Sequence, residues 1–123
     1  MDKRNGHYLG TEINEKWWNR YTREGFFARG KGEYWYDDTA FYFLRHLTQE
    51  PIVIPFHKVD DMKVGTWHCG RWVWGKPIVK ILWSHEGESL SSGFILSYDE
   101  DEMQSVMDDI SQQRNLSESE ENA

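Results

Sequence analysis

Residues 26–98 contain a series of short aromatic and apolar runs, and turn-forming residues separate most of them. The runs are "FFARGKGEYWYDD", "AFYFLRHL", "IVIPFHKVDDMKVG", "PIVKILWS" and "SLSSGFILSY". The turns are "DDT", "TQEP" and "HEGE". Aromatic and β-branched runs of this length are typical of β-strands, and consecutive strands with short connections pair antiparallel. The sequence therefore predicts an antiparallel β meander.

Near both ends of the chain the hydrophobic period changes to that of a helix. In "TEINEKWWNRYTR", Ile13, Trp17 and Tyr21 recur at four-residue steps, and Thr11 could cap the first turn. This spacing places the three apolar residues on one face of an amphipathic helix. We therefore expect an N-terminal helix over residues 11–23.

A second helical pattern follows the last run. Its apolar positions, at spacing i, i+3, i+4 and i+7, are Met103, Val106, Met107 and Ile110. Ser97 and Glu100 have the spacing of a capping box, and the acidic residues 99–102 would stabilise the positive end of the helix dipole. The pattern predicts an amphipathic C-terminal helix that packs its apolar face against one open end of the sheet.

The length of 123 residues suits a single domain. Residues 1–10 are polar and contain glycine, so we expect a flexible N-terminus there. The domain itself is expected over residues 11–113. Residues 114–123 include "NLSESEENA", which has one large apolar side chain to bury, so this stretch is expected to be a disordered acidic tail.

The composition also bears on location. The longest apolar runs are a few residues, far from the roughly 20 that a membrane-spanning helix needs, so the protein is not expected to be transmembrane. No apolar block follows the charged N-terminus, as it would in a secretory signal. A single cysteine, Cys69, cannot form an internal disulfide, which fits a reducing compartment. These features predict a cytoplasmic protein.

Charge is distributed unevenly along the chain, whose formal net charge is −7. Residues 1–98 are nearly balanced, and the acidity is concentrated in residues 99–123. Between Met62 and His85 there is no acidic residue, whereas four cations occur there. This acid-free window contains "GTWHCGRWVWGKP", which combines three tryptophans, a histidine and the cysteine. Basic residues interleaved with aromatic ones are the sharpest functional feature of the sequence.

The order of the segments resembles the pleckstrin-homology-like superfold and, within it, GRAM-type domains. The resemblance spans about residues 25–110 and is carried by "GEYWYDDTAFYFLRHL", "IVIPFHKVDDMKVG" with Ile54-Pro55, "IVKILWSHEGESLSSGFILS" and "DEDEMQSVMDDI". It implies an α+β fold with a partly open antiparallel barrel capped by the C-terminal helix, and a non-catalytic role in binding membranes or proteins. That superfold has seven strands, whereas five are clear here. We therefore expect the long first and third runs to split.

Catalytic and metal-binding patterns are weak by comparison. The histidines and Cys69 lack the local pairs, such as C-x-x-C or H-x-x-x-H, that structural zinc sites use. His68 and Cys69 are adjacent, so on a regular strand their side chains would point to opposite faces. The sequence therefore predicts no catalytic residue, no metal ligand and no cofactor.

The predicted function is that of a non-enzymatic binding module. Its predicted ligand-binding residues are Lys63, Arg71, Trp72, Trp74, Lys76 and Lys80. They would contact a partner protein or the headgroups of an anionic membrane. Nucleic acid is disfavoured, because an acidic chain repels a polyanion.

Two other interpretations of the same residues remain open. One is a small intracellular enzyme that uses Cys69 and a histidine. The other is that the tryptophans are structural, with Trp67 and Trp83 in the core and Trp72 and Trp74 covering a sheet edge.

Overall fold

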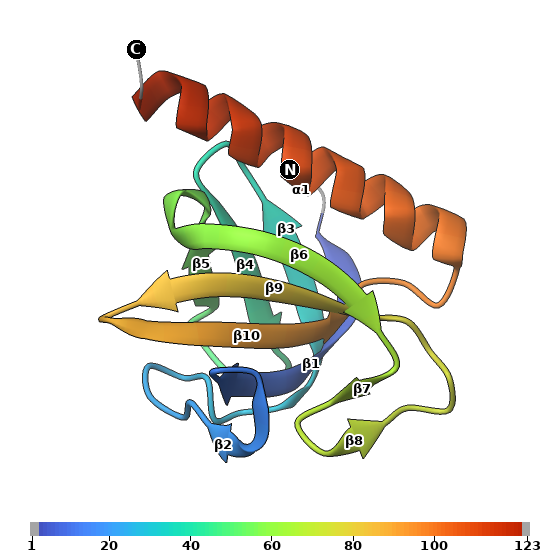
Figure 1. Cartoon of the computed structure of the whole chain (residues 1–123). Helices are drawn as coiled ribbons and strands as arrows, with labels where there is room; N and C mark the ends of the chain where they lie inside the picture. Colours follow the sequence, from blue (N-terminus) through green and yellow to red (C-terminus); the bar gives the residue numbers. More distant parts are fainter. Residues whose placement is uncertain (1–2, 122–123) are drawn as a thin grey trace.

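Eight strands form one antiparallel sheet, in the order β5-β4-β3-β1-β10-β9-β6 with β2 paired to β1. The computed structural model describes residues 3–121. Its elements are β1 (Arg4–Ile13), β2 (Lys16–Arg20), β3 (Gly30–Tyr36), β4 (Ala40–Arg45), β5 (Ile52–Pro55), the 3-10 helix η1 (Phe56–Lys58), β6 (Val59–Gly65), β7 (Trp67–His68), β8 (Arg71–Trp72), β9 (Ile78–His85), β10 (Glu88–Ile95) and α1 (Glu100–Glu121). The sheet curls around the core (Figure 1), and it is not closed, since β5 and β6 stand at opposite ends of the order. The predicted antiparallel architecture is confirmed.

The predicted N-terminal helix over residues 11–23 is wrong. Strands β1 and β2 occupy this region and form a hairpin in which Ile13 pairs with Lys16. The two residues between them, Asn14 and Glu15, have φ angles of 55° and 56°. Two consecutive residues with positive φ make the tight turn that matches the twist of a hairpin. The four-residue spacing of Ile13, Trp17 and Tyr21 therefore arises from two strands and the turn between them, and not from a helix.

Strand β1 also supplies the strand that the sequence-based count lacked. The third run does split as expected, into β5 and β6 with η1 between them. The first run does not split, because its glycine-rich part leads directly into the single strand β3. The additional strand comes instead from residues 4–13, whose polar and glycine-containing start hid their strand character.

Strand β1 is central in the sheet and is buried on both faces. Tyr8 belongs to the main core, where its ring lies 5.3 Å from that of Phe94. Leu9 points to the opposite face and forms a second small cluster with Ile78 and Ile95. Val73, which follows β8, packs against this second cluster. The β7–β8 hairpin is thereby seated on the outer face of the sheet.

Helix α1 crosses one end of the sheet, far from the end that carries β2, β7 and β8 (Figure 1). The apolar stripe predicted for it is buried in the main core, at Met103, Val106, Met107 and Ile110. The cap differs from the prediction: the Asp99 carboxylate, not Ser97, accepts hydrogen bonds from the backbone N–H groups of Asp101 and Glu102. The capping C-terminal helix is confirmed.

The boundaries expected from the sequence differ from those of the elements. Residues 4–10, part of the expected flexible N-terminus, belong to β1, and paired strands on both sides hold them. The stretch expected to be a disordered tail from residue 114 continues α1 as far as Glu121. Residues 1–2 and 122–123 lie outside the described part of the chain.

Candidate functional site

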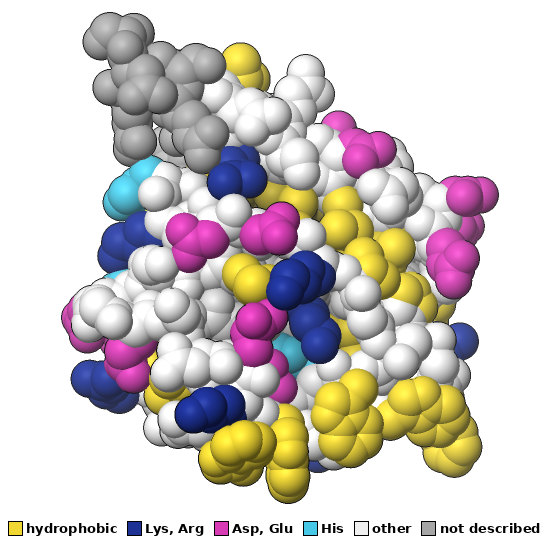
Figure 2. Space-filling view, in the orientation of Figure 1, with side chains coloured by type: hydrophobic (Ala, Val, Ile, Leu, Met, Phe, Trp, Pro, Cys, Tyr) yellow, Lys and Arg dark blue, Asp and Glu magenta, His cyan; other side chains and the backbone are white. Residues whose placement is uncertain are grey.

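Five of the seven tryptophans are exposed, and we call these five the aromatic rim. The aromatic rim consists of Trp17 and Trp18 in β2, Trp67 in β7, Trp72 in β8 and Trp74 in the turn after β8. Their exposed fractions run from 50% for Trp67 to 82% for Trp74. Figure 2 shows large hydrophobic side chains gathered at the end of the molecule that carries β2, β7 and β8. Exposed aromatic groups of this size on one end are unusual unless something binds there.

The aromatic rim is continuous across two hairpins that are distant in sequence. Trp67 pairs with Trp72 across the β7–β8 hairpin, and the Trp72 and Trp74 rings are 5.6 Å apart. A Cβ atom added at Gly70, in the turn of that hairpin, would lie 3.2 Å from the Trp17 ring. Trp17 of β2 therefore rests on the β7–β8 turn and joins the two hairpins into one surface.

The alternative interpretation, in which the tryptophans are structural, named Trp67, Trp72, Trp74 and Trp83. Only Trp83 among these four is buried. Trp83 is 1% exposed and belongs to the main core, where its indole N–H donates to the Ser92 hydroxyl. Trp67, which that interpretation also placed in the core, is half exposed. Sequence reasoning missed Trp17 and Trp18 as surface residues, because it assigned them to a helix.

Three of the cations predicted to bind a ligand have neighbours other than the tryptophans of the aromatic rim. They are Lys63, Lys76 and Lys80. Lys63 of β6 forms a 3.1 Å ion pair with Glu15. Lys80 of β9 is the cross-strand partner of Lys63. The ammonium group of Lys76 lies 4.8 Å from the centre of the Tyr98 ring. Lys63 and Lys76 therefore interact with a glutamate on the β1–β2 turn and with the segment before α1.

Arg71, in contrast, lies in β8 between the aromatic residues and is exposed. Burial, followed by the charges of Arg20 and Arg71, holds the pKa of the Arg29 guanidinium below its usual value. Arg20 and Arg29 also meet over Gly10, where an added Cβ would lie 3.4 Å from Arg20 Nε and 3.1 Å from Arg29 Cδ. Among the described side chains, none of these three arginines forms an ion pair with a carboxylate. We call Arg20, Arg29 and Arg71 the arginine group.

Behind the arginine group, His68 is fully buried against the sheet. One ring nitrogen, Nε2, is 2.9 Å from the backbone carbonyl of Gly10. The ring lies directly on Gly93 of β10, where any added Cβ would overlap the His68 ring. Burial lowers the pKa of His68 and so favours its neutral form. His68 thus inserts the β7–β8 hairpin, and the aromatic rim with it, into the sheet.

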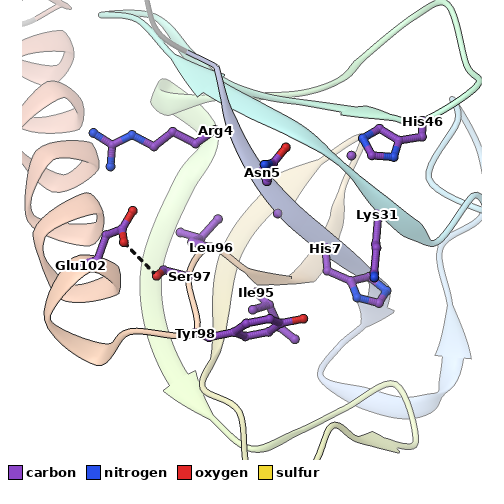
Figure 3. A pocket seen from close by; sticks show the side chains of 12 residues that line it. Arg4, Asn5, His7, Lys31, His46, Ile95, Leu96, Ser97, Tyr98 and Glu102 are labelled. Atoms are coloured by element: carbon purple, nitrogen blue, oxygen red, sulfur yellow. Dashed lines mark hydrogen bonds between the residues drawn. The ribbon is translucent and has the colours of Figure 1, made fainter.

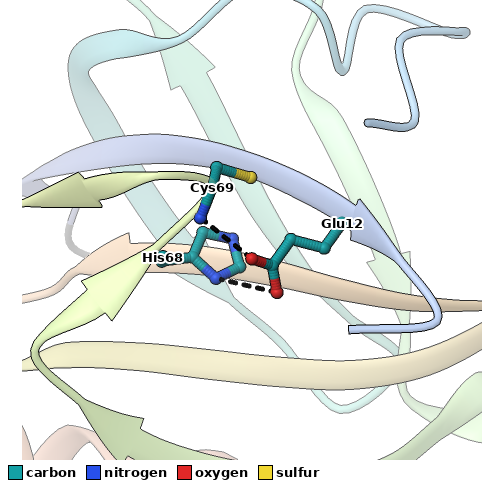
Figure 4. Close-up of side chains that lie close together, drawn as sticks. All are labelled: Glu12, His68 and Cys69. Atoms are coloured by element: carbon teal, nitrogen blue, oxygen red, sulfur yellow. Dashed lines mark hydrogen bonds and ion pairs between the residues drawn. The ribbon is translucent and has the colours of Figure 1, made fainter. Parts of the chain in front are cut away.

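Glu12, His68 and Cys69 converge in this buried region (Figure 4). The sequence-based expectation that His68 and Cys69 point to opposite faces is wrong. Cys69 has a φ angle of 50°, which breaks the regular strand alternation. Its backbone N–H donates to the Glu12 carboxylate at 2.9 Å.

This geometry does not favour Cys69 as a nucleophile. Burial, followed by the charge of Glu12, raises the pKa of the Cys69 thiol to about 11. The thiolate is the reactive form of cysteine, and this raised pKa disfavours it. His68 directs its Nδ1 toward Glu12 Oε1 at 3.6 Å.

A hollow of about 550 Å³ lies between β1, β3 and the segment that leads into α1 (Figure 3). Arg4, His7 and Lys31 line it together with Tyr98 and Glu102. Burial, followed by the charges of Lys31 and Arg71, lowers the pKa of His7. The hollow is therefore lined by apolar as well as ionisable side chains, and the ionisable ones come from several separate elements.

Within the described residues, no helix is both long and apolar enough to cross a bilayer. No match to the chain was found among curated proteins or among solved structures. The bacterial PH domain-like family matches residues 1–111, which include the whole sheet and the part of α1 that packs on it. The curled antiparallel sheet with one C-terminal helix across its end agrees with that match. The chain therefore belongs to the bacterial PH domain-like family.

Proposed function

We propose that this protein is a non-enzymatic binding module that docks on the anionic cytoplasmic surface of a membrane through its aromatic rim. PH-like domains are generally non-catalytic and often bind proteins or lipids, and the finer resemblance to GRAM-type domains stays part of this proposal. The observation that carries the proposal is the exposure of five tryptophans on two adjoining hairpins beside the arginine group.

The chemistry of the aromatic rim suits a membrane interface. Tryptophan has an apolar body and a polar N–H group, and it favours the headgroup region of bilayers. Lys16 lies 6.0 Å from the centre of the Trp18 ring, so a cation accompanies the aromatic groups on β2 as well. Tryptophan and arginine are also enriched at protein interfaces, so binding to a partner protein is one outcome of the tests below.

Magnitudes show that both parts of the surface are required. A cation near an anionic leaflet contributes about 1 kcal/mol, so Lys16 and the arginine group supply on the order of 4 kcal/mol. That energy alone corresponds to a dissociation constant of about 1 mM. Burial of one large apolar side chain contributes roughly 1.5–3 kcal/mol. The tryptophans therefore determine whether binding reaches a useful affinity, and the cations determine which surface is chosen.

Vesicle binding tests the proposal. We expect the protein to co-sediment with vesicles that contain phosphatidylglycerol and to bind pure phosphatidylcholine vesicles much more weakly. Trp72→Ser with Trp74→Ser should abolish binding and leave the fold intact, because both residues are exposed. Leu47→Ser, at a fully exposed apolar residue of the β4–β5 connection, is the matched control and should bind like the wild type.

The charge requirement is tested separately. Arg71→Glu with Lys16→Glu should abolish binding to anionic vesicles, and Arg71→Gln alone should weaken it. Arg23→Gln removes the same charge from an arginine that pairs with Glu88 instead of joining the arginine group, and it should have little effect. Binding that survives loss of the tryptophans or of the charges would overturn the proposal. The proposal would also be overturned if the wild-type protein did not bind vesicles and bound a protein or single-stranded nucleic acid instead.

A further inference from the structure

Three potential metal-binding side chains meet beneath the β7–β8 hairpin (Figure 4). They are Glu12 of β1, His68 of β7 and Cys69, which follows it. Their ligand atoms, a carboxylate oxygen, an imidazole nitrogen and a thiol sulfur, all lie within 4.8 Å of one another. All three residues are buried, at 4%, 0% and 7% exposure. Proximity by itself does not identify a site, so the orientation of His68 is the next consideration.

The hydrogen bond of His68 fixes which nitrogen is available. A backbone carbonyl only accepts hydrogen bonds, so Nε2, at 2.9 Å from the Gly10 oxygen, must carry a proton. In the neutral ring, Nδ1 then presents a lone pair. This atom is fully buried and has no hydrogen-bond partner among the described residues. Metal-binding histidines characteristically use their other N–H in this way, on a carbonyl or a carboxylate.

The lone pair of Nδ1 faces an anion. Glu12 Oε1 is 3.6 Å from Nδ1, which is too long for a hydrogen bond. Two electron-rich atoms in a dry interior repel each other unless a proton or a metal ion lies between them, and 3.6 Å is longer than a proton-bridged contact. Zinc bonds of about 2.0–2.2 Å to nitrogen and oxygen, at a tetrahedral angle, separate the two ligand atoms by roughly 3.4 Å. The observed separation is close to that value.

The surrounding charges are compatible with a divalent cation. Arg20 and Arg29 lie beside the Cys69 sulfur, since a Cβ atom added at Gly10 would be 3.0 Å from Sγ, 3.1 Å from Arg29 Cδ and 3.4 Å from Arg20 Nε. A divalent ion together with one carboxylate ligand and one thiolate ligand forms a complex that has no net charge. The nearby cations therefore have no net charge to repel once the ion is bound.

We propose that Glu12, His68 and Cys69 form a three-ligand site for a zinc-class divalent cation. Nitrogen, oxygen and sulfur ligands in one small site match the preferences of Zn²⁺ and of its spectroscopic substitute Co²⁺. The ion joins β1 to the β7–β8 hairpin and so fastens the aromatic rim to the sheet. The site concerns the isolated protein, so it can stand or fail independently of membrane binding.

Cobalt titration of the chelator-treated full chain tests the site. We expect one equivalent of Co²⁺ to produce the intense visible bands of tetrahedral cobalt and the near-ultraviolet band of a thiolate ligand. Zn²⁺ should then displace the cobalt. Cys69→Ser should remove the thiolate band, and His68→Gln should weaken binding by more than about 10-fold.

A second histidine cluster in the chain provides the matched control. Glu24, His85 and Glu86 also bring their ligand atoms within 4.8 Å of one another, but at the surface. His85→Gln should leave the cobalt spectrum and stoichiometry unchanged. A spectrum that depends on His85 and not on His68 would assign binding to that surface cluster and overturn the proposal.

The melting temperature provides a second test, which can be used if a variant folds too poorly for the cobalt titration. Zn²⁺ should raise the melting temperature of the wild type, because a ligand that binds the folded state stabilises it. It should not raise the melting temperature of Cys69→Ser, a substitution that nearly preserves size. Absence of a thiolate band in the wild type, or an equal thermal shift in both proteins, overturns the site.

Discussion

Gly93 shows how one residue determines the placement of the aromatic rim. His68 rests directly on the Gly93 backbone, and its ring occupies the space that a Cβ atom would need. Nε2 of the same ring donates to the Gly10 carbonyl. The histidine therefore contacts two glycines that are cross-strand partners in β1 and β10. A longer side chain at position 93 would push the β7–β8 hairpin away from the sheet.

We predict that Gly93→Ala destabilises the protein by about 1–3 kcal/mol, the usual cost of overpacking a buried site. Chemical denaturation measures this change in the free energy of unfolding. Gly65→Ala is the control, because its Cβ would make only an ordinary contact at 3.4 Å with the Lys80 side chain. If both alanine variants are equally stable, the β7–β8 hairpin is not seated as described.

At the scale of elements, α1 is held by its apolar stripe and by polar contacts, which include a hydrogen bond from Arg114 to the backbone carbonyl of Asp60 in β6. Ile110 is 1% exposed and belongs to the main core. The Tyr36 hydroxyl of β3 donates to the Asp109 carboxylate at 3.0 Å. Leu116, one turn and a half further along, is half exposed. The apolar stripe of α1 is therefore buried over its first three turns, up to Ile110, and Leu116 lies outside the core.

Ile110→Ala should cost roughly 2–4 kcal/mol, as expected for truncation of a buried isoleucine. Leu116→Ala should change stability by less than about 0.5 kcal/mol, because its side chain is exposed. Deletion of residues 115–123 should likewise leave the melting temperature unchanged. Urea unfolding of the three variants makes the comparison, and a neutral Ile110→Ala would show that α1 is not docked.

The Tyr36–Asp109 contact makes a pH-dependent contribution. Burial, followed by the hydrogen bond to Asp109, raises the pKa of Tyr36 from 10.0 to about 12. A raised folded-state pKa gives stability that is fully present below the unfolded pKa of 10 and is lost as the pH rises through about 12.

Tyr36→Phe should therefore be less stable than the wild type at neutral pH and should lose less stability between pH 10 and 12. Denaturation curves at several pH values measure both effects. Parallel pH profiles for the two proteins would contradict the assignment of this loss to Tyr36.

The whole molecule has opposite electrostatic ends. Acidic α1 crosses one end of the sheet, and β2, β7 and β8, which carry most of the aromatic rim and also Arg20 and Arg71, lie at the other (Figure 1). This separation would orient the protein with its aromatic rim toward an anionic surface. It also removes the sequence-based objection that acidic residues would repel an anionic partner, because those acids belong to the far end.

Salt should separate the two contributions to membrane binding. Screening weakens exposed charge interactions, with a Debye length of about 8 Å at physiological ionic strength, but leaves apolar burial largely unaffected. Vesicle affinity of the wild type should fall with added sodium chloride and then level off. Arg71→Gln should show a shallower salt dependence, whereas Trp74→Ser should keep the wild-type slope at a lower affinity. Equal slopes for the wild type and Arg71→Gln would show that Arg71 does not contact the membrane.

The sequence by itself determined the elements whose hydrophobic residues follow a regular local spacing. The alternating runs from residue 30 onward became strands, and the stripe from Met103 to Ile110 became a buried helical face, because each pattern fits one secondary structure. The third run also split as expected, at Pro55, where η1 begins. The presence of a basic-aromatic surface near Trp72 was a prediction from composition, and its binding role stays one.

Only the tertiary structure decided what periodicity leaves ambiguous. Trp17 has helical spacing, yet the turn at Asn14 and Glu15 and the pairing with β1 make its segment a strand. Glu12 and Cys69 are 57 residues apart, and the sheet brings them into hydrogen-bond contact. Burial depends on which surfaces the chain brings together, so no local pattern could distinguish exposed Trp67 from buried Trp83. Long-range strand pairing, rather than sequence spacing, therefore created both the aromatic rim and the buried cluster beneath it.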